Sequence, residues 1–210
     1  MKPEISFLDE SHLRVDGVDF QCCLQGGGLG EPLPGSLPVF KPRDMVESYL
    51  ALRERIAAPV IVELGIYRGG STALLQALFQ PERLIAIELT AQPAEALSTY
   101  VSNRRLQSVL RPHYGVDQAD RAKVTAILAE ELAGRPIDLV VDDASHQYAP
   151  TLASFEMLFP RLRPGGLYVI EDWNCHHRAA DYRADAANES EQSWTGAFVR
   201  AVERSVPNPD

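Results

Sequence analysis

Five short apolar runs, separated by stretches with helical periodicity, constrain the fold of this chain more than any other feature. The runs are rich in Val, Ile and Leu and occupy residues 60–65, 84–89, 109–115, 137–143 and 167–173. Nearly continuous apolar runs of this length are typical of strands whose two faces are both covered by helices. The alternation therefore predicts an α/β fold: a Rossmann-like, doubly wound and mainly parallel sheet flanked by helices.

Residues 1–40 have a different character. They are rich in Gly and Pro around QGGGLGEPLPGSLP, with short strand-like pieces at residues 13–18 and near Phe20. We expect an irregular N-terminal arm here, followed by one main domain over residues 41–210. That domain opens with apolar residues at helical spacing, which predict a helix that ends before Pro59. The residues that carry this spacing are Met45, Tyr49, Leu50, Leu52 and Ile56.

Composition narrows the class of ligand. The net charge is −9, and no long run of Lys and Arg is present to neutralise phosphates, so we expect a small-molecule substrate and no nucleic acid. Three cysteines cannot form a disulfide framework, which fits a cytoplasmic protein. The acidic N-terminus does not resemble a signal peptide, and no apolar run approaches the roughly 18 residues of a membrane span.

The loop after the first strand of the main domain is the first candidate site. In parallel α/β sheets, ligands bind beyond the carboxyl ends of the strands, where the strand order reverses. The glycine spacing here is G-x-x-x-G-G, whereas the dinucleotide fingerprint is G-x-G-x-x-G, and Glu63 precedes it. A carboxylate repels a pyrophosphate but attracts the ammonium and sulfonium groups of S-adenosylmethionine. The candidate cofactor-binding residues of this loop are Glu63, Gly65, Tyr67, Gly69, Gly70, Ser71 and Thr72.

Acids at the ends of later strands extend this cofactor site. Glu88 closes the second strand, where a carboxylate can accept hydrogen bonds from both ribose hydroxyls. Asp117 and Gln118 follow the third strand and could contact the adenine, although capping of a helix by Asp117 explains its position equally well. Asp142, at the end of the fourth strand, is either a neighbour of the cofactor or a structural acid.

A second group of polar residues follows the fourth and fifth strands. Asp142 and Asp143 end the fourth, Glu171 and Asp172 end the fifth, and His146 lies three residues beyond Asp143. If the two strands are neighbours, their acidic ends share one edge of the sheet. Such crowding raises pKa values or recruits a cation, and oxygen ligands suit Mg²⁺, Mn²⁺ or Ca²⁺.

The segments ELGIYRGGST, DDASH and LRPGGLYVIEDW together resemble the metal-dependent sugar O-methyltransferases of macrolide biosynthesis, the macrocin and mycinamicin group. Cephalosporin-hydroxylase-like proteins are relatives of that group, and the resemblance covers about residues 40–175. It implies that Asp143, Glu171 and Asp172 bind Mg²⁺ and that His146 is the general base. His176 and His177 are competing candidates for the base, and Trp173 and Tyr148 are candidates for the acceptor pocket.

The resemblance also draws attention to the end of the chain. Class I methyltransferases have seven strands, the last two forming a hairpin, whereas only five strands are visible in this sequence. After a polar stretch, residues 194–206 predict a final helix, so we expect the hairpin to be absent and the fifth strand to offer an open edge. An open edge invites self-association, which makes a homo-oligomer an expected assembly.

The residues favour S-adenosylmethionine-dependent methylation of a hydroxyl on a small molecule such as a sugar or natural product. A hydroxyl must lose its proton as it attacks the methyl group, which a divalent cation and a nearby imidazole both assist. Two alternatives stay open at this point. One is an NAD-dependent oxidoreductase on the same scaffold, and the other is a non-catalytic protein that binds a nucleoside cofactor.

Overall fold

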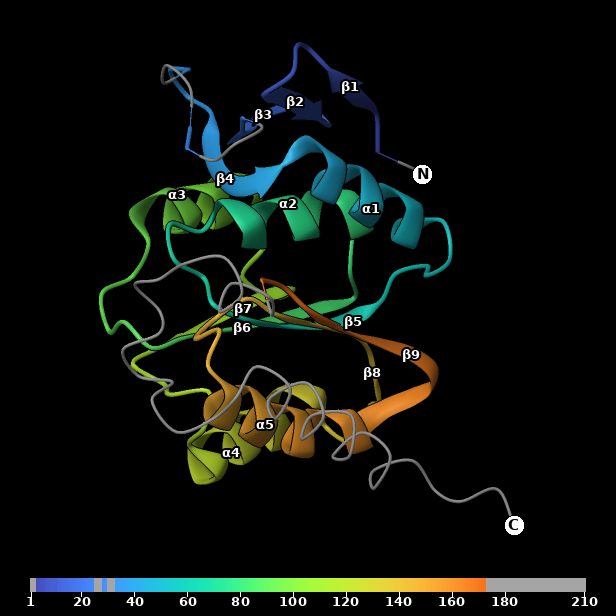
Figure 1. The fold of residues 1–210 in the computed structure, drawn as a ribbon, viewed down its shortest axis with the longest axis vertical. Helices are drawn as coiled ribbons and strands as arrows, with labels where there is room; N and C mark the ends of the chain where they lie inside the picture. The colour runs from blue at the N-terminus through green and yellow to red at the C-terminus, as the bar shows by residue number, and fades with distance from the viewer. Residues whose placement is uncertain (1–2, 25–27, 30–32, 173–210) are drawn as a thin grey trace.

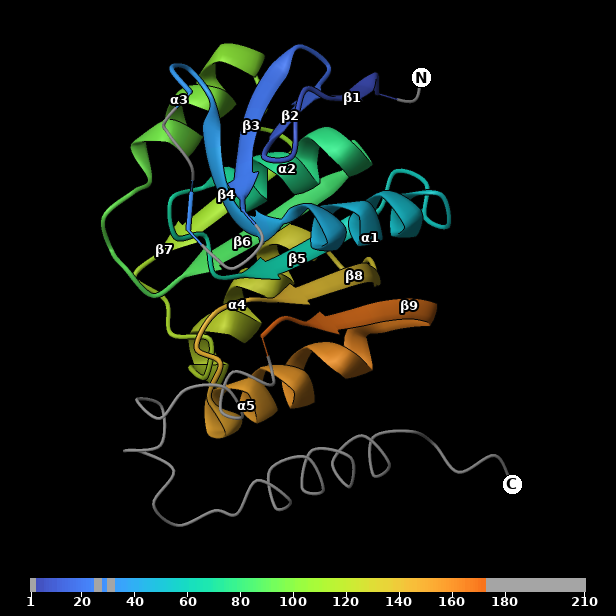
Figure 2. The ribbon, with the colours of Figure 1, turned by 45° about the horizontal axis from the view of Figure 1, so that its top comes forward.

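The computed structural model describes residues 3–24, 28–29 and 33–172, and its centre is a five-stranded parallel sheet. The strand order is β7-β6-β5-β8-β9, as the two views in Figure 1 and Figure 2 show. The strands are β5 (Val60–Leu64), β6 (Arg83–Glu88), β7 (Leu110–Tyr114), β8 (Ile137–Asp142) and β9 (Leu162–Ile170). All four neighbouring pairs are parallel, so the predicted doubly wound α/β fold is confirmed.

Helices cover both faces of this sheet (Figure 1). One layer holds α1 (Arg43–Arg53), α2 (Gly70–Phe79) and α3 (Glu95–Arg104), and the other holds α4 (Arg121–Leu132) and α5 (Tyr148–Leu158). A short 3₁₀ helix, Phe159–Arg161, leads into β9. Along β5, Ile61 packs into the core beneath the first layer, while Val60 and Val62 pack beneath the second. Both faces of each central strand are buried, which explains why the strands lack an alternating polar pattern.

The N-terminal arm is a second, four-stranded sheet, so the prediction of irregular structure was wrong. Its strands, in the spatial order β1-β2-β3-β4, are β1 (Ile5–Phe7), β2 (His12–Val15), β3 (Val18–Cys23) and β4 (Leu37–Pro42). The hairpin between β2 and β3 turns at Asp16-Gly17, both of which have positive φ, as two-residue hairpin turns require. Leu13 and Phe20 are fully buried in the same core as α1 and α2. Packing against that core stabilises strands that are too short to form alone.

Strand β4 lies directly against the start of α2. A Cβ atom added to Gly70 would lie 1.8 Å from the carbonyl oxygen of Pro38, closer than any side chain can approach. Gly70 was predicted to belong to the cofactor loop, and its lack of a side chain also lets β4 pack against the start of α2. The N-terminal sheet is therefore held beside the loop that follows β5.

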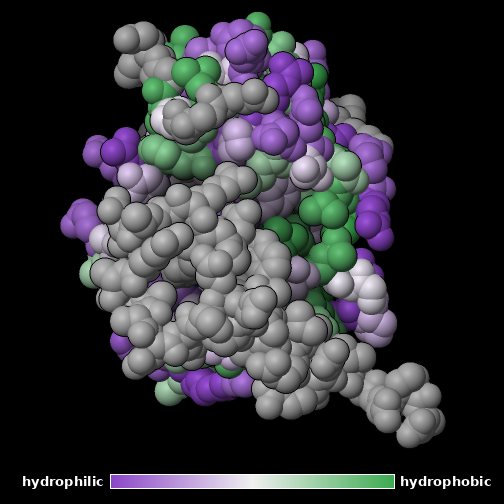
Figure 3. All heavy atoms as spheres, viewed as in Figure 1, coloured by the Kyte–Doolittle hydropathy of each residue, from purple (hydrophilic) through white to green (hydrophobic). Residues whose placement is uncertain are grey.

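Strand β9 is one of the two edge strands of the parallel sheet within the described residues. The predicted final helix at residues 194–206, and the predicted absence of two further strands, concern residues outside the described part of the chain. Where the structure is described, no helix is both long and apolar enough to cross a membrane. The face in Figure 3 mixes hydrophilic and hydrophobic residues over its described part.

Substitution of Gly70 by Ala should lower the free energy of unfolding by about 1–3 kcal/mol, because the added methyl group overlaps the backbone of Pro38. Urea denaturation measures this loss. Gly134→Ala is the matched control: nothing lies within 4 Å of the added methyl group there, and only the positive φ is unfavourable. A Gly70→Ala protein as stable as the unmodified chain would contradict the described packing of β4 on α2.

Candidate active site

The predicted site residues gather at the carboxyl edge of the parallel sheet. Backbone hydrogen bonds join the strand ends there: the Asp143 N–H donates to the Leu64 carbonyl at 2.9 Å, and the Glu171 N–H donates to the Asp142 carbonyl at 3.0 Å. β5 and β8 are the strands between which the chain order reverses. The geometry thus agrees with the expectation that ligands bind at such a reversal.

Two glycines of the loop after β5 are required for packing. Gly65 has φ of 96°, and a Cβ atom there would lie 2.2 Å from the carbonyl oxygen of Asp143. Gly69 has φ of 86°, and a Cβ atom there would lie 2.4 Å from the Cβ of Leu97 in α3. Gly65 lets the loop after β5 touch the loop after β8, which brings the two groups of predicted residues together.

Glu63 has an unusual environment for a carboxylate. Its side chain is fully buried, its Oε1 accepts a hydrogen bond from the Ser71 hydroxyl at 2.7 Å, and its Oε2 makes no hydrogen bond to any described residue. The hydroxyl of Thr72 is likewise buried; it lies near this carboxylate but makes no hydrogen bond of normal geometry to a described residue. Burial raises the pKa of Glu63 to about 7, although the nearby hydroxyls of Thr72 and Ser71 act in the opposite direction. A buried carboxylate oxygen without a donor is suited to a ligand that brings a cationic or N–H group.

Glu88 holds the cofactor loop in place. Its Oε2 accepts the N–H groups of Ile66 at 2.9 Å and Tyr67 at 2.8 Å, and its Oε1 accepts the N–H of Thr90 at 2.8 Å. Burial acts to raise the pKa of Glu88, but these backbone N–H groups together lower it below its ordinary value. Oε2 already accepts two donors, whereas Oε1 accepts one of the three backbone N–H groups and has room for a ribose hydroxyl.

Tyr67, whose N–H donates to Glu88, has an exposed aromatic side chain. It has positive φ, its side chain is exposed, and its ring meets the exposed ring of Phe40 edge to face at 5.0 Å between centroids. The loop therefore presents an aromatic surface to solvent next to Glu88, formed jointly with the N-terminal sheet.

Asp117 forms a turn before α4: its Oδ1 accepts the Ala119 N–H at 2.8 Å. The helix cap itself is Asp120, whose side chain accepts the Lys123 N–H at 3.0 Å. Neither contact blocks the exposed Asp117 from a ligand, but the capping role that the sequence suggested for it belongs to Asp120.

Gln118 and Asp142 form a buried network beneath the strand ends. The Gln118 amide donates to Asp142 Oδ1 at 3.2 Å and to the Ser154 hydroxyl at 2.8 Å, and its carbonyl oxygen accepts the Ser145 N–H at 3.0 Å. The Tyr168 hydroxyl donates to Asp142 Oδ2 at 3.2 Å. Burial raises the pKa of Asp142 to about 7. Of the two interpretations of Asp142, these contacts favour the structural acid.

Three of the predicted residues form a group that could hold a metal ion. Asp143, His146 and Asp172 each offer one ligand atom, and these atoms all lie within 4.8 Å of one another. The His146 Nε2 lies 3.8 Å from Asp143 Oδ1. Both His146 and Asp172 have positive φ, so tight turns after β8 and β9 direct them to this place. Two carboxylates and an imidazole are a suitable donor set for a divalent cation.

Glu171, the third predicted metal ligand, is not in this group, and it is bound instead by two residues that were not predicted to belong to the site. The ammonium group of Lys41 donates to Glu171 Oε2, and the hydroxyl of Tyr49 donates to Glu171 Oε1. Lys41 also donates to Asp143 Oδ2 at 2.7 Å. Burial alone would lower the pKa of Lys41, but Asp143 and Glu171 raise it above its ordinary value, which keeps the ammonium charged.

The inward position of Lys41 could have been recognised from the sequence if residues 37–42 had been assigned to a strand. In β4 the buried positions alternate, and Lys41 lies on the same inward side as Leu37 and Val39. An inward-facing lysine in a strand requires a partner carboxylate, because an unpaired buried charge is costly. His176, His177 and Trp173 lie outside the described residues, and Tyr148 begins α5.

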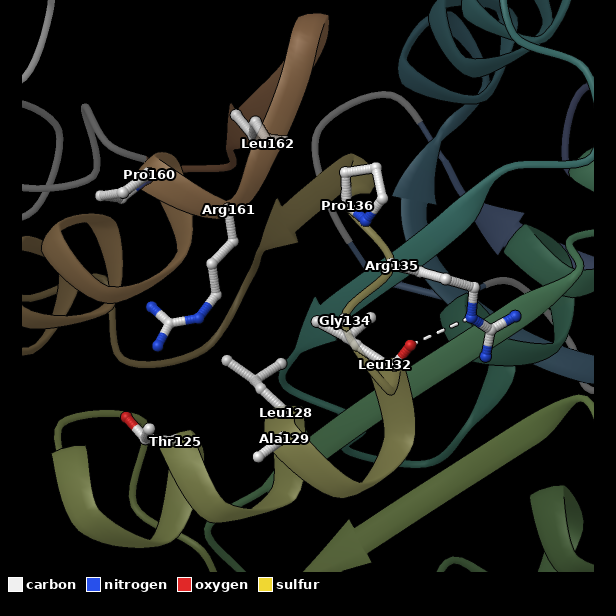
Figure 4. A pocket seen from close by; sticks show the side chains of 10 residues that line it. All are labelled: Thr125, Leu128, Ala129, Leu132, Gly134, Arg135, Pro136, Pro160, Arg161 and Leu162. Atoms are coloured by element: carbon white, nitrogen blue, oxygen red, sulfur yellow. Dashed lines mark hydrogen bonds between the residues drawn. The ribbon is translucent and has the colours of Figure 1, made fainter.

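Two cavities of the described structure lie away from this edge. One, of about 410 Å³, lies between the end of α4 and the segments that lead into β8 and β9 (Figure 4). The other, of about 420 Å³, lies between α3 and the outer strand β7. Neither is lined by a predicted site residue.

Comparison with known proteins identifies relatives of this site. A segment of 74 residues is 43% identical to the 8-demethyl-8-alpha-L-rhamnosyl tetracenomycin-C 2'-O-methyltransferase of Streptomyces olivaceus, covering 28% of this chain and 20% of that protein. A segment of 79 residues is 40% identical to the demethylmacrocin O-methyltransferase of Streptomyces fradiae, covering 30% of this chain and 20% of that protein. The match thus spans only about a fifth of the length of these two relatives.

The fold is similar to that of MycE, the methyltransferase from the mycinamycin biosynthetic pathway, solved in complex with Mg and SAH. The TM-score is 0.53 at 23% identity, and the alignment covers 77% of this chain and 43% of that one. At this identity the likeness concerns the fold alone. The family model described as a methyltransferase domain matches residues 62–173, more than half of the chain and every strand end of the site. The chain belongs to this methyltransferase domain family.

Proposed function

We propose that this chain is an S-adenosylmethionine-dependent O-methyltransferase domain that methylates a hydroxyl on a small molecule, such as a sugar of a natural product, with the help of a divalent cation. One juxtaposition carries the proposal. The buried, unpaired oxygen of Glu63 lies in the loop after β5, and the Asp143, His146 and Asp172 group lies in the loops after β8 and β9. Gly65 holds the first two of these loops in contact.

The cofactor half of the proposal rests on charge and shape. S-adenosylmethionine carries its methyl group on a sulfonium and also has an ammonium group, and Glu63 offers an acceptor that no described residue uses. The loop from Gly65 to Thr72 would contact the cofactor, with Glu88 toward the ribose. Asp117 would lie toward the adenine, and Asp142 would support the site from beneath.

The metal half rests on the donor set and on the relatives. Asp143 and Asp172 would hold a divalent cation, Mg²⁺ or another, with His146 beside it, and their ligand atoms already lie within 4.8 Å of one another. Such a cation lowers the pKa of a hydroxyl that it contacts. MycE was solved with Mg and SAH, and two matching relatives are named as methyltransferases of a rhamnosyl tetracenomycin and of demethylmacrocin.

His146 is the proposed proton acceptor. Its Nε2 lies 3.8 Å from Asp143 Oδ1, close enough for the carboxylate to stabilise the imidazolium that forms when the acceptor hydroxyl loses its proton. The remaining task of the chain is positional, because methyl transfer requires the hydroxyl oxygen, the methyl carbon and the sulfur to lie nearly in line.

The two alternative functions, an NAD-dependent oxidoreductase and a non-catalytic protein that binds a nucleoside cofactor, are less well supported. A nicotinamide cofactor would bring a pyrophosphate toward the buried carboxylate of Glu63, and the chain belongs to a methyltransferase domain family. A non-catalytic binding protein would have no use for His146 and the two aspartates around it. The assay below separates that rival from the enzyme.

A methyl-transfer assay tests the proposal directly. The chain is incubated with S-adenosylmethionine and a panel of deoxysugar glycosides, phenols and catechols, and transfer is measured with and without EDTA. We expect transfer to a sugar hydroxyl, loss of transfer in EDTA, and recovery with excess Mg²⁺. Asp143→Asn should mimic EDTA, whereas Asp120→Asn, which alters the α4 cap and an exposed ion pair with Lys123, should not. Cofactor binding without transfer to any acceptor would favour the non-catalytic rival, and full activity in EDTA would remove the metal.

Cofactor binding should weaken as the pH falls through about 7, the value to which burial raises the pKa of Glu63. Above this pH the free protein already carries the charged carboxylate that attracts the cofactor. Below it a proton must leave on binding, so affinity falls by up to about tenfold per pH unit. Calorimetric titration of S-adenosylmethionine at several pH values measures the effect. Glu63→Gln controls for titration of the cofactor itself, and the same pH dependence in both proteins would exclude Glu63 from the site.

His146→Gln should lower the methyl-transfer rate by roughly 10²- to 10⁴-fold while leaving SAH affinity nearly unchanged, because only the proton acceptor is lost. Single-turnover kinetics with saturating cofactor measure the rate. His113→Gln is the matched control, since His113 contacts Glu131 rather than any proposed site residue. An unchanged rate in His146→Gln would move the base to another residue.

A further inference from the structure

We infer that Lys41 acts as a built-in cation of the proposed metal site, which takes Glu171 out of the ligand set and orients Asp143 toward the ion. This inference rests on the proposed function, because it concerns how the same carboxylates bind their cation. Lys41 lies outside the segment that the family model matches, and it reaches the site from the N-terminal sheet.

The contacts of Lys41 divide the carboxylates into two sets. Its ammonium group lies 2.7 Å from Asp143 Oδ2 and also binds Glu171 Oε2, while Tyr49 binds the other oxygen of Glu171. Both oxygens of Glu171 are thus engaged by donors. Asp143 Oδ1 is the oxygen that faces His146, at 3.8 Å from its Nε2. One side of Asp143 faces the ammonium, and the other faces the group that could hold an ion.

The burial of Lys41 and Glu171 strengthens their attraction. The Lys41 side chain is 2% exposed and that of Glu171 is 4% exposed, so water does not screen their attraction as it does at a surface. Asp143 is more open, at 24%. The ammonium therefore lies on the protein side of the cluster, and the carboxylates of Asp143 and Asp172, which would hold the ion, are the more exposed ones.

The charge of Lys41 adjusts the net charge of the carboxylate cluster to that of a divalent cation. Asp143, Glu171 and Asp172 together would carry three negative charges, and the positive charge of Lys41 leaves two. A divalent cation matches that remainder. Without Lys41 the cluster would hold an excess negative charge, and Glu171 would be free to turn toward the ion as a third carboxylate ligand.

A purely structural role for Lys41 is the alternative. The ion pair spans from β4 to the ends of β8 and β9, so it could serve only to fasten the N-terminal sheet to the main domain. If Lys41 has only this structural role, its removal should lower stability without changing the affinity for Mg²⁺. The two roles therefore differ in how metal binding and stability are linked.

The test compares Lys41→Met with Lys123→Met, an exposed lysine whose loss controls for the chemical change. Mg²⁺ affinity is measured by calorimetry and thermal stability with and without Mg²⁺. We expect Lys41→Met to melt below the unmodified chain without metal and to gain more stability from Mg²⁺. Its Mg²⁺ dissociation constant should fall by about tenfold, because a positive charge in contact with the site is gone. A lower melting temperature with unchanged or weaker Mg²⁺ affinity would overturn the inference and leave only the structural role of Lys41.

The double variant Lys41→Met with Glu171→Gln keeps the test decisive if Lys41→Met fails to fold. It removes one charge of each sign, so a buried carboxylate is not left uncompensated. We expect its Mg²⁺ affinity to stay within about threefold of the unmodified chain, because Glu171 is not a ligand. A loss of more than about tenfold would make Glu171 a ligand and overturn the inference.

Binding of SAH and Mg²⁺ by the unmodified chain distinguishes failure of this inference from failure of the proposed function. If the unmodified chain binds both SAH and Mg²⁺ but the variants do not respond as described, only the role of Lys41 falls. If the unmodified chain binds SAH and no Mg²⁺, the cation site and this inference both fall, and cofactor binding stands. If it binds neither, the proposed function itself fails.

Discussion

The contact between Gly65 and the backbone of Asp143 is the constraint on which the site depends. A side chain at residue 65 would lie 2.2 Å from the Asp143 carbonyl oxygen, so the loops after β5 and β8 meet only because glycine is there. The Asp143 N–H fixes the same junction by donating to Leu64. Since β5 and β8 are central neighbours, this contact places a loop suited to a cationic cofactor beside carboxylates suited to a metal.

The N-terminal sheet belongs to the site as much as to the fold. Gly70 lets β4 approach α2 closely, and that approach carries Lys41 to the ends of β8 and β9. Tyr49, from the helix that follows β4, completes the set of donors around Glu171. Sequence-distant elements thus supply the positive charge and the hydroxyl that the buried carboxylate of Glu171 requires.

The parallel sheet could be predicted because each strand is continuously apolar, and the site edge because its acids directly follow those strands. Strand-like pieces were predicted at residues 13–18 and near Phe20, but not the whole N-terminal sheet, because its strands are short and lie among Gly and Pro, although the Asp16-Gly17 turn marked one hairpin. Sequence order also could not show that Glu171 binds Lys41, since pairing across 130 residues is decided by packing. The structure gives the loop glycines a role in contacts between protein segments, and their predicted contact with a cofactor stays a prediction.

Three acids near the carboxyl ends of neighbouring strands show that the partners of a carboxylate, rather than its residue type, assign its role. Glu88 accepts three backbone N–H groups, and its pKa is lowered, so it stays charged while it holds the loop. Asp142 is buried against Gln118 and Tyr168. Glu63 is equally buried but keeps one oxygen without a described partner. A cationic ligand is stabilised most where a buried acceptor has no donor of its own, so Glu63 sets where the charged end of the cofactor would lie.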